Sequence, residues 1–175
     1  GIYAADDDVT INAGHNTLRL QVENTVGNPT GIYAGNAGMT LTADQINVIT
    51  RGQEGGNSLT NAIQLDDAED GGTNMILNGD VNISMAGGLG GNGVAVQRVN
   101  RFGAPSHGAG GSTAGIDING NLKIAGADTG KWGIPLNRQN VFARHNNAGI
   151  LTHTLGSYVA VSGDVDMTVY GNGII

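Results

Sequence analysis

The chain has 175 residues, which fits a single domain, and a formal net charge of −7. Nucleic-acid binding depends on Lys and Arg contacts to phosphate, so this acidic balance argues against a nucleic-acid partner. The sequence has no cysteine, which excludes disulfides, thiolate metal sites and cysteine nucleophiles. It also has no apolar run of about 18 residues, so no membrane-spanning helix is expected.

Short alternating apolar runs, bounded by Gly, Asn and Asp, predict a protein of many strands. No window of a dozen residues keeps the apolar spacing of a helix without a glycine. In residues 1–30, strands are expected at 2–4, 9–13 and 18–22. Residues 31–60 repeat them at 32–34, 39–41 and 46–49, and residues 61–92 at 63–65, 75–77 and 81–83.

Two longer units follow, over 93–132 and 133–172. The second copies the first at a shift of about forty, because Gly133–Arg138 resembles Gly93–Arg98. Their extra length is expected in two insertions, Val99–Thr113 and Gln139–Gly156. The remaining strands are expected at 116–118, 122–124, 159–161 and 165–169.

Corners rich in Asn and Gly separate the last two strands of the third, fourth and fifth units, at 78–80, 119–121 and 162–164. Such corners are also typical of antiparallel hairpins. Recurrence of the same strand pattern every 30 to 40 residues instead favours a coil whose strands pair with their copies. We therefore predict an all-β, right-handed parallel β-helix (solenoid) of about five rungs of three strands, with loop insertions in the last two rungs. The expected inner columns contain Val9/Ile11, Met39/Leu41, Ile116/Ile118 and Val159/Val161.

The rungs are expected at about 1–30, 31–60, 61–92, 93–132 and 133–172, and all of 1–175 is expected to form one segment. The chain starts and stops at the first strand of a rung, without an initiating Met. Two hypotheses follow: excision from a longer solenoid, or end-to-end stacking of copies, with Gly173-Ile174-Ile175 leading toward Gly1-Ile2-Tyr3 of the next molecule.

The corner sequences NGDVNI (78–83), NGNLKI (119–124) and SGDVDM (162–167), with the absence of cysteine and the one-sided insertions, resemble Gram-negative autotransporter passenger domains. Filamentous adhesins of the two-partner type share this repeat pattern. The run GNGVAVQR (91–98), followed by RFGAP (101–105), is similar to segments of long autotransporter-type surface proteins. The resemblance covers most of the chain from about residue 61 onward, and it implies a fold and an extracellular or outer-surface location.

The two insertions supply the predicted binding edge. Insertions on one edge of a solenoid are typical of its binding face, and aromatic and Arg side chains carry much interface energy. The candidates are Arg98, Arg101, Phe102, Trp132, Arg138, Phe142 and Arg144. The alternative is that the phenylalanines fix their loops onto the stack while the arginines remain solvated.

Acidic residues offer a weaker candidate site. Asp66, Asp67 and Asp70 lie in a tight loop followed by two glycines, so they are the candidate calcium ligands. Paired carboxylates also serve polysaccharide-active enzymes, but acidic residues at corners are ordinary turn formers. The four histidines show no metal-ligand spacing. No catalytic residue and no cofactor other than calcium is expected.

The expected function is that of a structural and adhesive stalk segment of a bacterial secreted or cell-surface protein. Its expected partners are host or bacterial surface glycans or proteins, or copies of itself stacked end to end. The first alternative is a self-stacking subunit of an extracellular β-solenoid fibre. A polysaccharide-active β-helix enzyme is the second.

Overall fold

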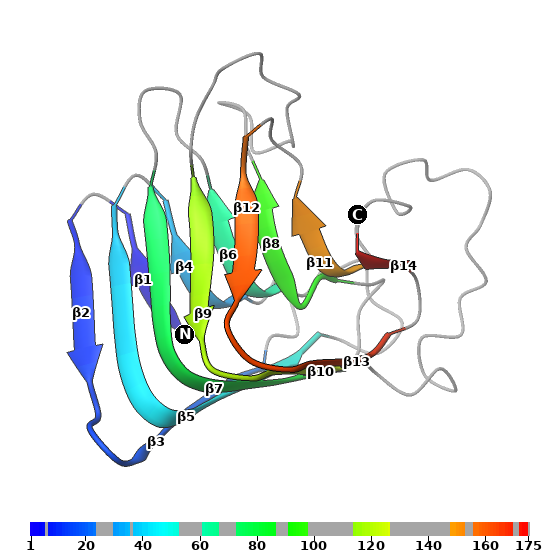
Figure 1. The fold of residues 1–175 in the computed structure, drawn as a ribbon, viewed down its shortest axis with the longest axis horizontal. Helices are drawn as coiled ribbons and strands as arrows, with labels where there is room; N and C mark the ends of the chain where they lie inside the picture. Colours follow the sequence, from blue (N-terminus) through cyan, green and yellow to red (C-terminus); the bar gives the residue numbers. More distant parts are fainter. Residues whose placement is uncertain are drawn as a thin grey trace.

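The computed structural model describes residues 1–5, 7–23, 30–35, 37–52, 61–66, 73–86, 91–97, 114–126, 148–152, 156–169 and 172–174. Every regular element in these ranges is a β-strand (Figure 1). The strands are β1 (Ile2–Ala4), β2 (Val9–Asn12), β3 (Thr17–Glu23), β4 (Thr30–Ala34), β5 (Met39–Arg51), β6 (Asn61–Asp66), β7 (Asn74–Ala86), β8 (Val94–Gln97), β9 (Gly115–Asn119), β10 (Leu122–Ala125), β11 (Ala148–Thr152), β12 (Tyr158–Val161), β13 (Val165–Thr168) and β14 (Asn172–Ile174). The same ranges contain no helix of the length and apolarity needed to cross a membrane.

All strand pairs in the described ranges are parallel. Six strands, in the order β1-β4-β6-β8-β11-β14, form one sheet, which we call face one. The strand order follows the chain, so each strand pairs with its counterpart from the preceding and the following passage. This arrangement confirms the predicted parallel, all-β architecture and excludes an antiparallel meander for these strands.

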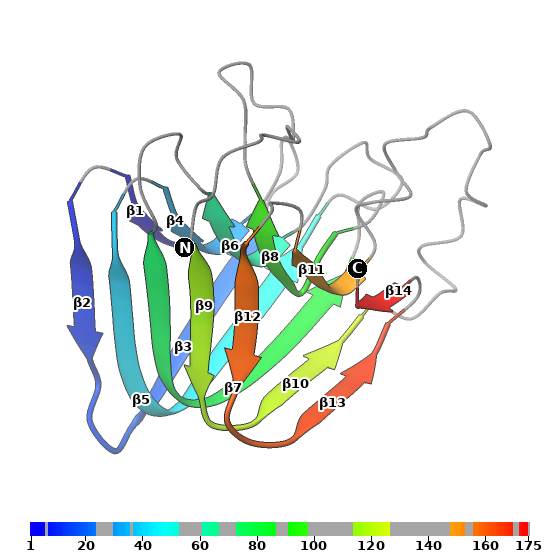
Figure 2. The same cartoon turned by 45° about the horizontal axis from the view of Figure 1, so that its top comes forward.

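The second sheet has eight strands and bends around a corner. Face two consists of β2, the first half of β5, the first half of β7, β9 and β12. Face three consists of β3, the second halves of β5 and β7, β10 and β13. Figures 1 and 2 show β5 and β7 turning from one face onto the other without a break. We call one passage through the three faces a coil; the arrangement is compatible with a parallel β-helix or solenoid.

The core lies between the faces and consists of columns of apolar side chains from successive coils. Alternate residues of β5 are buried, as the period of two in a strand requires. The predicted inner columns are confirmed: Met39, Leu41, Ile116 and Ile118 are buried, while Val9, Ile11, Val159 and Val161 are partly buried against the core.

Glycine and alanine form a column at the start of face one, where the chain passes close to its neighbours. A Cβ on Gly93 would lie 2.7 Å from the carbonyl oxygen of Gly149 and 2.8 Å from Ile124 Cδ1. A Cβ on Gly149 would lie 2.8 Å from the carbonyl oxygen of Gly173. Because these contacts leave no room for a side chain, glycine at positions 93 and 149 is a packing requirement, whereas the same column takes Ala62 in β6.

This column corrects one strand assignment. The sequence copy predicted residues 134–136 as the counterpart of 94–96, whereas Val94 pairs with Ile150 in β11. The predicted insertion Gln139–Gly156 is therefore wrong in part, because it contains a sheet strand. Pro135 has no backbone N–H for a ladder between two neighbours, whereas Gly149-Ile150 keeps the glycine column and the apolar column. Residues 127–147 lie outside the described ranges.

The corners between faces two and three stack through side-chain amides. Asn78 Nδ2 donates to Thr42 Oγ1 at 3.1 Å, and Asn119 Nδ2 donates to Asn78 Oδ1 at 2.8 Å. On face three, Asn82 Nδ2 donates to Asn47 Oδ1 at 3.0 Å. Each bond joins equivalent positions in consecutive coils, so the asparagine-rich corners hold the coils in register.

Candidate binding surface

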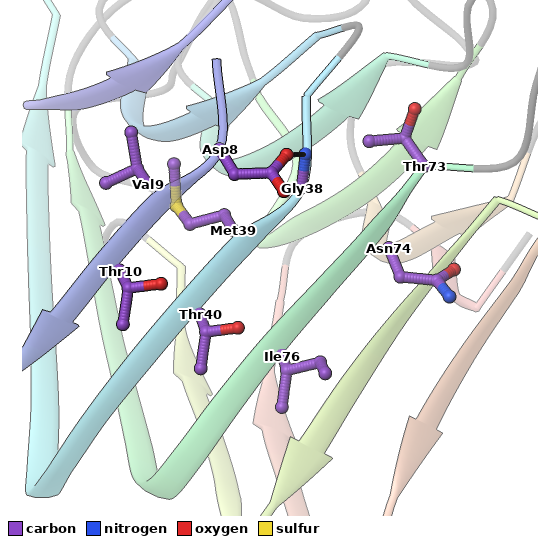
Figure 3. Close-up of a pocket in the computed structure, with 9 residues that line it drawn as sticks. All are labelled: Asp8, Val9, Thr10, Gly38, Met39, Thr40, Thr73, Asn74 and Ile76. Carbon is purple, nitrogen blue, oxygen red and sulfur yellow. Dashed lines mark hydrogen bonds between the residues drawn. The ribbon is translucent and has the colours of Figure 1, made fainter.

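A shallow groove of about 450 Å³ lies on the outer side of face two, and we call it the face-two groove (Figure 3). Its lining comes from three neighbouring strands and the corners before them: Asp8, Val9, Thr10, Gly38, Met39, Thr40, Thr73, Asn74 and Ile76. Thr10, Thr40 and Ile76 share one register column, so they form a row across the strands. The groove therefore follows the axis of the stack.

Asp8 fixes one side of the groove. Its Oδ1 accepts a hydrogen bond of 2.7 Å from the backbone N–H of Gly38, one coil later (Figure 3). A Cβ at Gly38 would lie 3.2 Å from the same oxygen, so glycine gives the carboxylate close access to the backbone. Asp8, Thr10 and Asn74 are exposed and offer a carboxylate, a hydroxyl and an amide to a ligand.

Face two continues beyond the groove with Asp117 and Tyr158. Asp117 follows Ile76 in the same column, and the ring of Tyr158 lies over Gly115, where a Cβ would collide with it. The Tyr158 hydroxyl donates to Asp117 Oδ2 at 3.2 Å. Partial burial, followed by the charge and hydrogen bond of Asp117, raises the pKa of Tyr158. With a strand spacing of about 4.8 Å, polar groups extend over roughly 19 Å from β2 to β12.

Face one carries an exposed aromatic pair at its outer side. Tyr3 and Tyr33 stack with ring centroids 4.5 Å apart and an interplanar angle of 7°. Tyr3 is 66% exposed, and the Tyr33 hydroxyl donates to Asp66 Oδ2 at 2.7 Å. Burial, and then the hydrogen bond and charge of Asp66, raise the pKa of Tyr33 well above its usual value. Tyr33 is therefore a neutral donor at physiological pH.

A row of amides extends from this pair along face one. Gln64 Nε2 donates to Asp66 Oδ1 at 2.7 Å, and Asn61 Nδ2 donates to Gln64 Oε1 at 2.7 Å. Asn61 Oδ1 accepts from the backbone N–H of Asn92, and Asn92 Oδ1 accepts from the backbone N–H of Ala148. The first two bonds lie within β6 and the last two join consecutive coils, so the row is structural.

The predicted calcium loop is only partly within the described residues. Both carboxylate oxygens of Asp66 accept hydrogen bonds, from Tyr33 and Gln64, while Asp67 and Asp70 lie outside the described ranges. Within those ranges no cluster of three His, Cys, Asp or Glu side chains is found. Calcium binding by this loop stays a prediction.

The predicted binding edge also stays a prediction. Its seven residues lie outside the described ranges: Arg98, Arg101, Phe102, Trp132, Arg138, Phe142 and Arg144. The structure accordingly brings none of them together and separates none of them.

The acidic corner residues have structural partners. Asp80 Oδ1 accepts from the backbone N–H of Asn121 at 2.9 Å, and Asn121 Oδ1 accepts from that of Asp164 at 2.8 Å. His15 Nδ1 lies 3.2 Å from Asp44 Oδ1, and both side chains are largely exposed. The Asp80 carboxylate therefore has a structural role at its corner, where it binds the following coil, and Asp164 contributes its backbone N–H to the same column.

Sequence reasoning did not identify the face-two groove, because its residues are outward positions of ordinary alternating strands. Only the register brings Thr10, Thr40 and Ile76 into one row. A signal was present for the tyrosine pair, since Gly-Ile-Tyr-Ala occurs at both 1–4 and 31–34. Placing these repeats side by side predicts stacked rings.

Comparison with known proteins gives no further assignment: no family model, curated protein or solved structure matches the chain.

Proposed function

We propose that the chain is a segment of a closed, right-handed parallel β-helix that serves as a stiff stalk and binds extended glycans along face two. The observation that carries the stalk is the alignment of like residues in columns over consecutive coils. Closure of each coil is supported by the repeated return of the chain to the same three faces. Right-handedness rests on the general preference of parallel crossovers.

The stiffness of the proposed stalk comes from bonds between coils. Parallel ladders join every described strand to a neighbouring coil, and the amide bonds at Asn78 and Asn82 repeat this connection at the corner and on face three. Bending the stack would have to break several of these bonds together, because they are distributed around its circumference. Because the described strands are hydrogen-bonded between coils, their backbone should resist cleavage by a protease.

The glycan proposal rests on the chemistry of the face-two groove. Carboxylate, hydroxyl and amide groups at Asp8, Thr10 and Asn74 can bond sugar hydroxyls, and Tyr158 adds an aromatic ring further along the axis. The groove is open and linear, which fits a polymer better than an enclosed small molecule. The negative charges of Asp8 and Asp117 favour neutral over acidic polymers.

The proposed location, the outer surface of a Gram-negative bacterium, rests on the resemblance of the corner sequences to autotransporter passengers and filamentous adhesins. On that proposal, host or bacterial surface glycans are the partners. The predicted edge around Arg98, Trp132 and Arg138 is a second proposed contact surface, for glycans or proteins. We propose no enzymatic activity.

The binding test uses the chain against a panel of neutral and acidic polysaccharides, with affinity measured by biolayer interferometry. Replacing Asn74 and Tyr158 together with Ala should weaken binding of a neutral polymer about tenfold or more, since each lost bond or aromatic contact contributes about 1 kcal/mol. Tyr3→Ala is the matched control, because it removes an exposed tyrosine from face one and should leave affinity unchanged.

A second variant, with Arg98, Trp132 and Arg138 all replaced by Ala, tests the insertion edge in the same assay. Loss of binding only in this variant would move the contact from face two to the edge. Equal affinity in the face-two variant and the unsubstituted chain would contradict the groove proposal. The stalk is tested separately by limited proteolysis, and rapid cleavage within the described strands would contradict it.

A further inference from the structure

One outward column of face two contains two glycines between larger residues. In coil order it consists of Asp8, Gly38, Asn74, Gly115 and Tyr158. The following column, from Val9 to Val159, packs on the core, so the side chains of this column lie on the outer side. Each glycine has a neighbouring coil on both sides, so the gaps above the two glycines do not depend on where the stack begins or ends.

The chain fills the gap at Gly115 with one of its own aromatic rings. A Cβ on Gly115 would collide with Cζ, Cε1 and Cε2 of Tyr158, so the ring lies across the glycine backbone. In this position the Tyr158 hydroxyl reaches Asp117 and donates to its Oδ2 at 3.2 Å. A glycine in this column therefore makes a seat for a six-membered ring that carries a hydroxyl group.

The equivalent gap at Gly38 contains no ring from the part of the chain that the structure describes. A Cβ on Gly38 would lie 3.2 Å from Asp8 Oδ1 and 3.7 Å from the backbone oxygen of Asn74. Asn74 follows Gly38 in the column as Tyr158 follows Gly115, but asparagine is a shorter residue without a ring. The gap at Gly38 is accordingly part of the open face-two groove (Figure 3).

We propose that the gap at Gly38 is a subsite for one pyranose ring of a neutral glycan, seated as the ring of Tyr158 is seated on Gly115. This inference rests on the proposed glycan binding and assigns one sugar unit to one place in the groove. The exposed side chains of Asp8, Thr10 and Asn74 surround the gap. A pyranose has several hydroxyls to bond these groups, whereas the phenol of a partner protein's tyrosine has one.

Asp8 gives this subsite its preference for a neutral sugar. The backbone N–H of Gly38 holds its Oδ1 at 2.7 Å, which fixes the carboxylate beside the gap. A carboxylate has about four acceptor positions, so acceptor positions beyond this one bond are available to sugar hydroxyls. A uronic acid would instead bring a second negative charge next to Asp8, which is unfavourable.

The first test is Gly38→Ala, which adds a methyl group inside the gap. Gly38 is not among the glycines with a positive φ, and the nearest atom belongs to the exposed side chain of Asp8, so the variant should fold. The methyl group should weaken glycan binding about tenfold. Gly35→Ala is the matched control, because its Cβ would be similarly close to a side chain, 3.3 Å from Tyr33, but at the end of face one. It should bind like the unsubstituted chain.

The second test is Asn74→Tyr, which copies the arrangement of Tyr158 and Gly115 one gap earlier. The new ring should lie across Gly38 and abolish binding, whereas Asn74→Ala, which loses one hydrogen bond, should weaken binding only about fivefold. Ser84→Tyr is the matched control, because it adds a tyrosine at an exposed position of the same strand, β7, but on face three. It should leave affinity unchanged.

Affinities are measured by isothermal titration calorimetry with neutral hexasaccharides of glucose, galactose and mannose and with a hexasaccharide of galacturonic acid. The subsite predicts that a neutral hexasaccharide binds more tightly than the acidic one. If the unsubstituted chain binds none of the neutral probes, the proposed function is overturned together with the subsite. If Asn74→Ala with Tyr158→Ala weakens binding, but Gly38→Ala and Asn74→Tyr do not, only the subsite is overturned.

A further probe, N-acetyltyrosinamide, tests the alternative occupant. If it binds more tightly than every hexasaccharide, the occupant of the gap is an aromatic side chain of a protein, and the sugar subsite is overturned. Circular dichroism and unfolding curves establish that each variant is folded. Should Gly38→Ala fail to fold, Asn74→Tyr still decides, because Asn74 is exposed and its replacement adds no atom to the core.

Discussion

Glycine at position 79 is required by two independent constraints. Its φ is 133°, and a Cβ there would collide with the carbonyl oxygen of Ala43 in the neighbouring coil. Gly14 also has a positive φ, of 59°, but a Cβ at that position would have nothing within 4 Å. A substitution at Gly14 therefore tests backbone strain alone, whereas a substitution at Gly79 tests backbone strain together with crowding between coils.

This contrast gives the first stability prediction. Gly14→Ala should cost about 1 kcal/mol, since alanine tolerates left-handed backbone at that price in strain. Gly79→Ala should cost about 3 kcal/mol or more, because it adds a collision with Ala43 to a conformation that is almost restricted to glycine. Urea denaturation of both variants measures the difference. Equal losses of unfolding free energy in the two variants would show that the neighbouring coils move apart at this corner and make room for the added Cβ.

Tyr33 links stability to alkaline pH. Its folded pKa is raised above the ordinary value of about 10, so the folded state holds this proton when the unfolded chain has lost it. The contribution of protonated Tyr33 to the free energy of unfolding is fully present below about pH 10. It is lost as the pH rises from there toward the folded pKa of Tyr33. Stability should therefore fall in this alkaline range.

The corresponding variant is Tyr33→Phe. At neutral pH it should cost about 1 kcal/mol, because Asp66 loses a donor, but its stability should decline less above pH 10. Urea denaturation at neutral and alkaline pH tests both effects, with tyrosinate absorbance followed in parallel. The same alkaline decline in both proteins would place the responsible group elsewhere.

At the scale of an element, β5 contains two threonines with opposite environments. Thr50 is fully buried, and among the described residues its Oγ1 has no hydrogen-bond partner. Thr42 Oγ1 instead accepts a hydrogen bond from Asn78 in the next coil. One strand thus offers a hydroxyl whose removal relieves a burial cost and another whose removal breaks a contact between coils.

Thr50→Val should stabilise the protein by about 1 kcal/mol, since it replaces an unpaired buried hydroxyl with a methyl group of similar size. Thr42→Val should destabilise it by about 1 kcal/mol, because Asn78 loses its acceptor. Thermal unfolding of the two variants should give shifts in Tm of opposite sign. A loss of stability on Thr50→Val would mean that its hydroxyl has a bonding partner.

The strands were the most predictable part of the structure. Alternation of apolar and polar residues located β2, β3, β9, β10 and β12 within a residue or two. It did not predict that β5 and β7 each continue through a corner, because the sequence at Asn78-Gly79-Asp80 is also that of a turn. In the structure, the ladder between β5 and β7 continues past a register shift between Thr42 and Gln45.

Similarity between sequence units was a poorer guide to strand pairing than the requirements of the sheet. Residues 133–138 resemble 93–98 in sequence, yet β8 pairs with β11, in which Gly149 and Ile150 meet the column requirements. The face-two groove depends on a register that links residues about thirty positions apart, so local patterns do not reveal it. The predicted edge residues, from Arg98 to Arg144, lie outside the described ranges.

At the scale of the whole molecule, one kind of hydrogen bond points the same way along the stack. Side-chain oxygens of Asp8, Asn61, Asp80, Asn92 and Asn121 each accept a backbone N–H from a residue later in the chain. A chain that folds while emerging N-terminus first would lay its second, fourth and fifth coils on acceptors that are already fixed in place. Growth from the N-terminal side would therefore be templated, whereas growth from the other side would begin with acceptors that have nothing to bind.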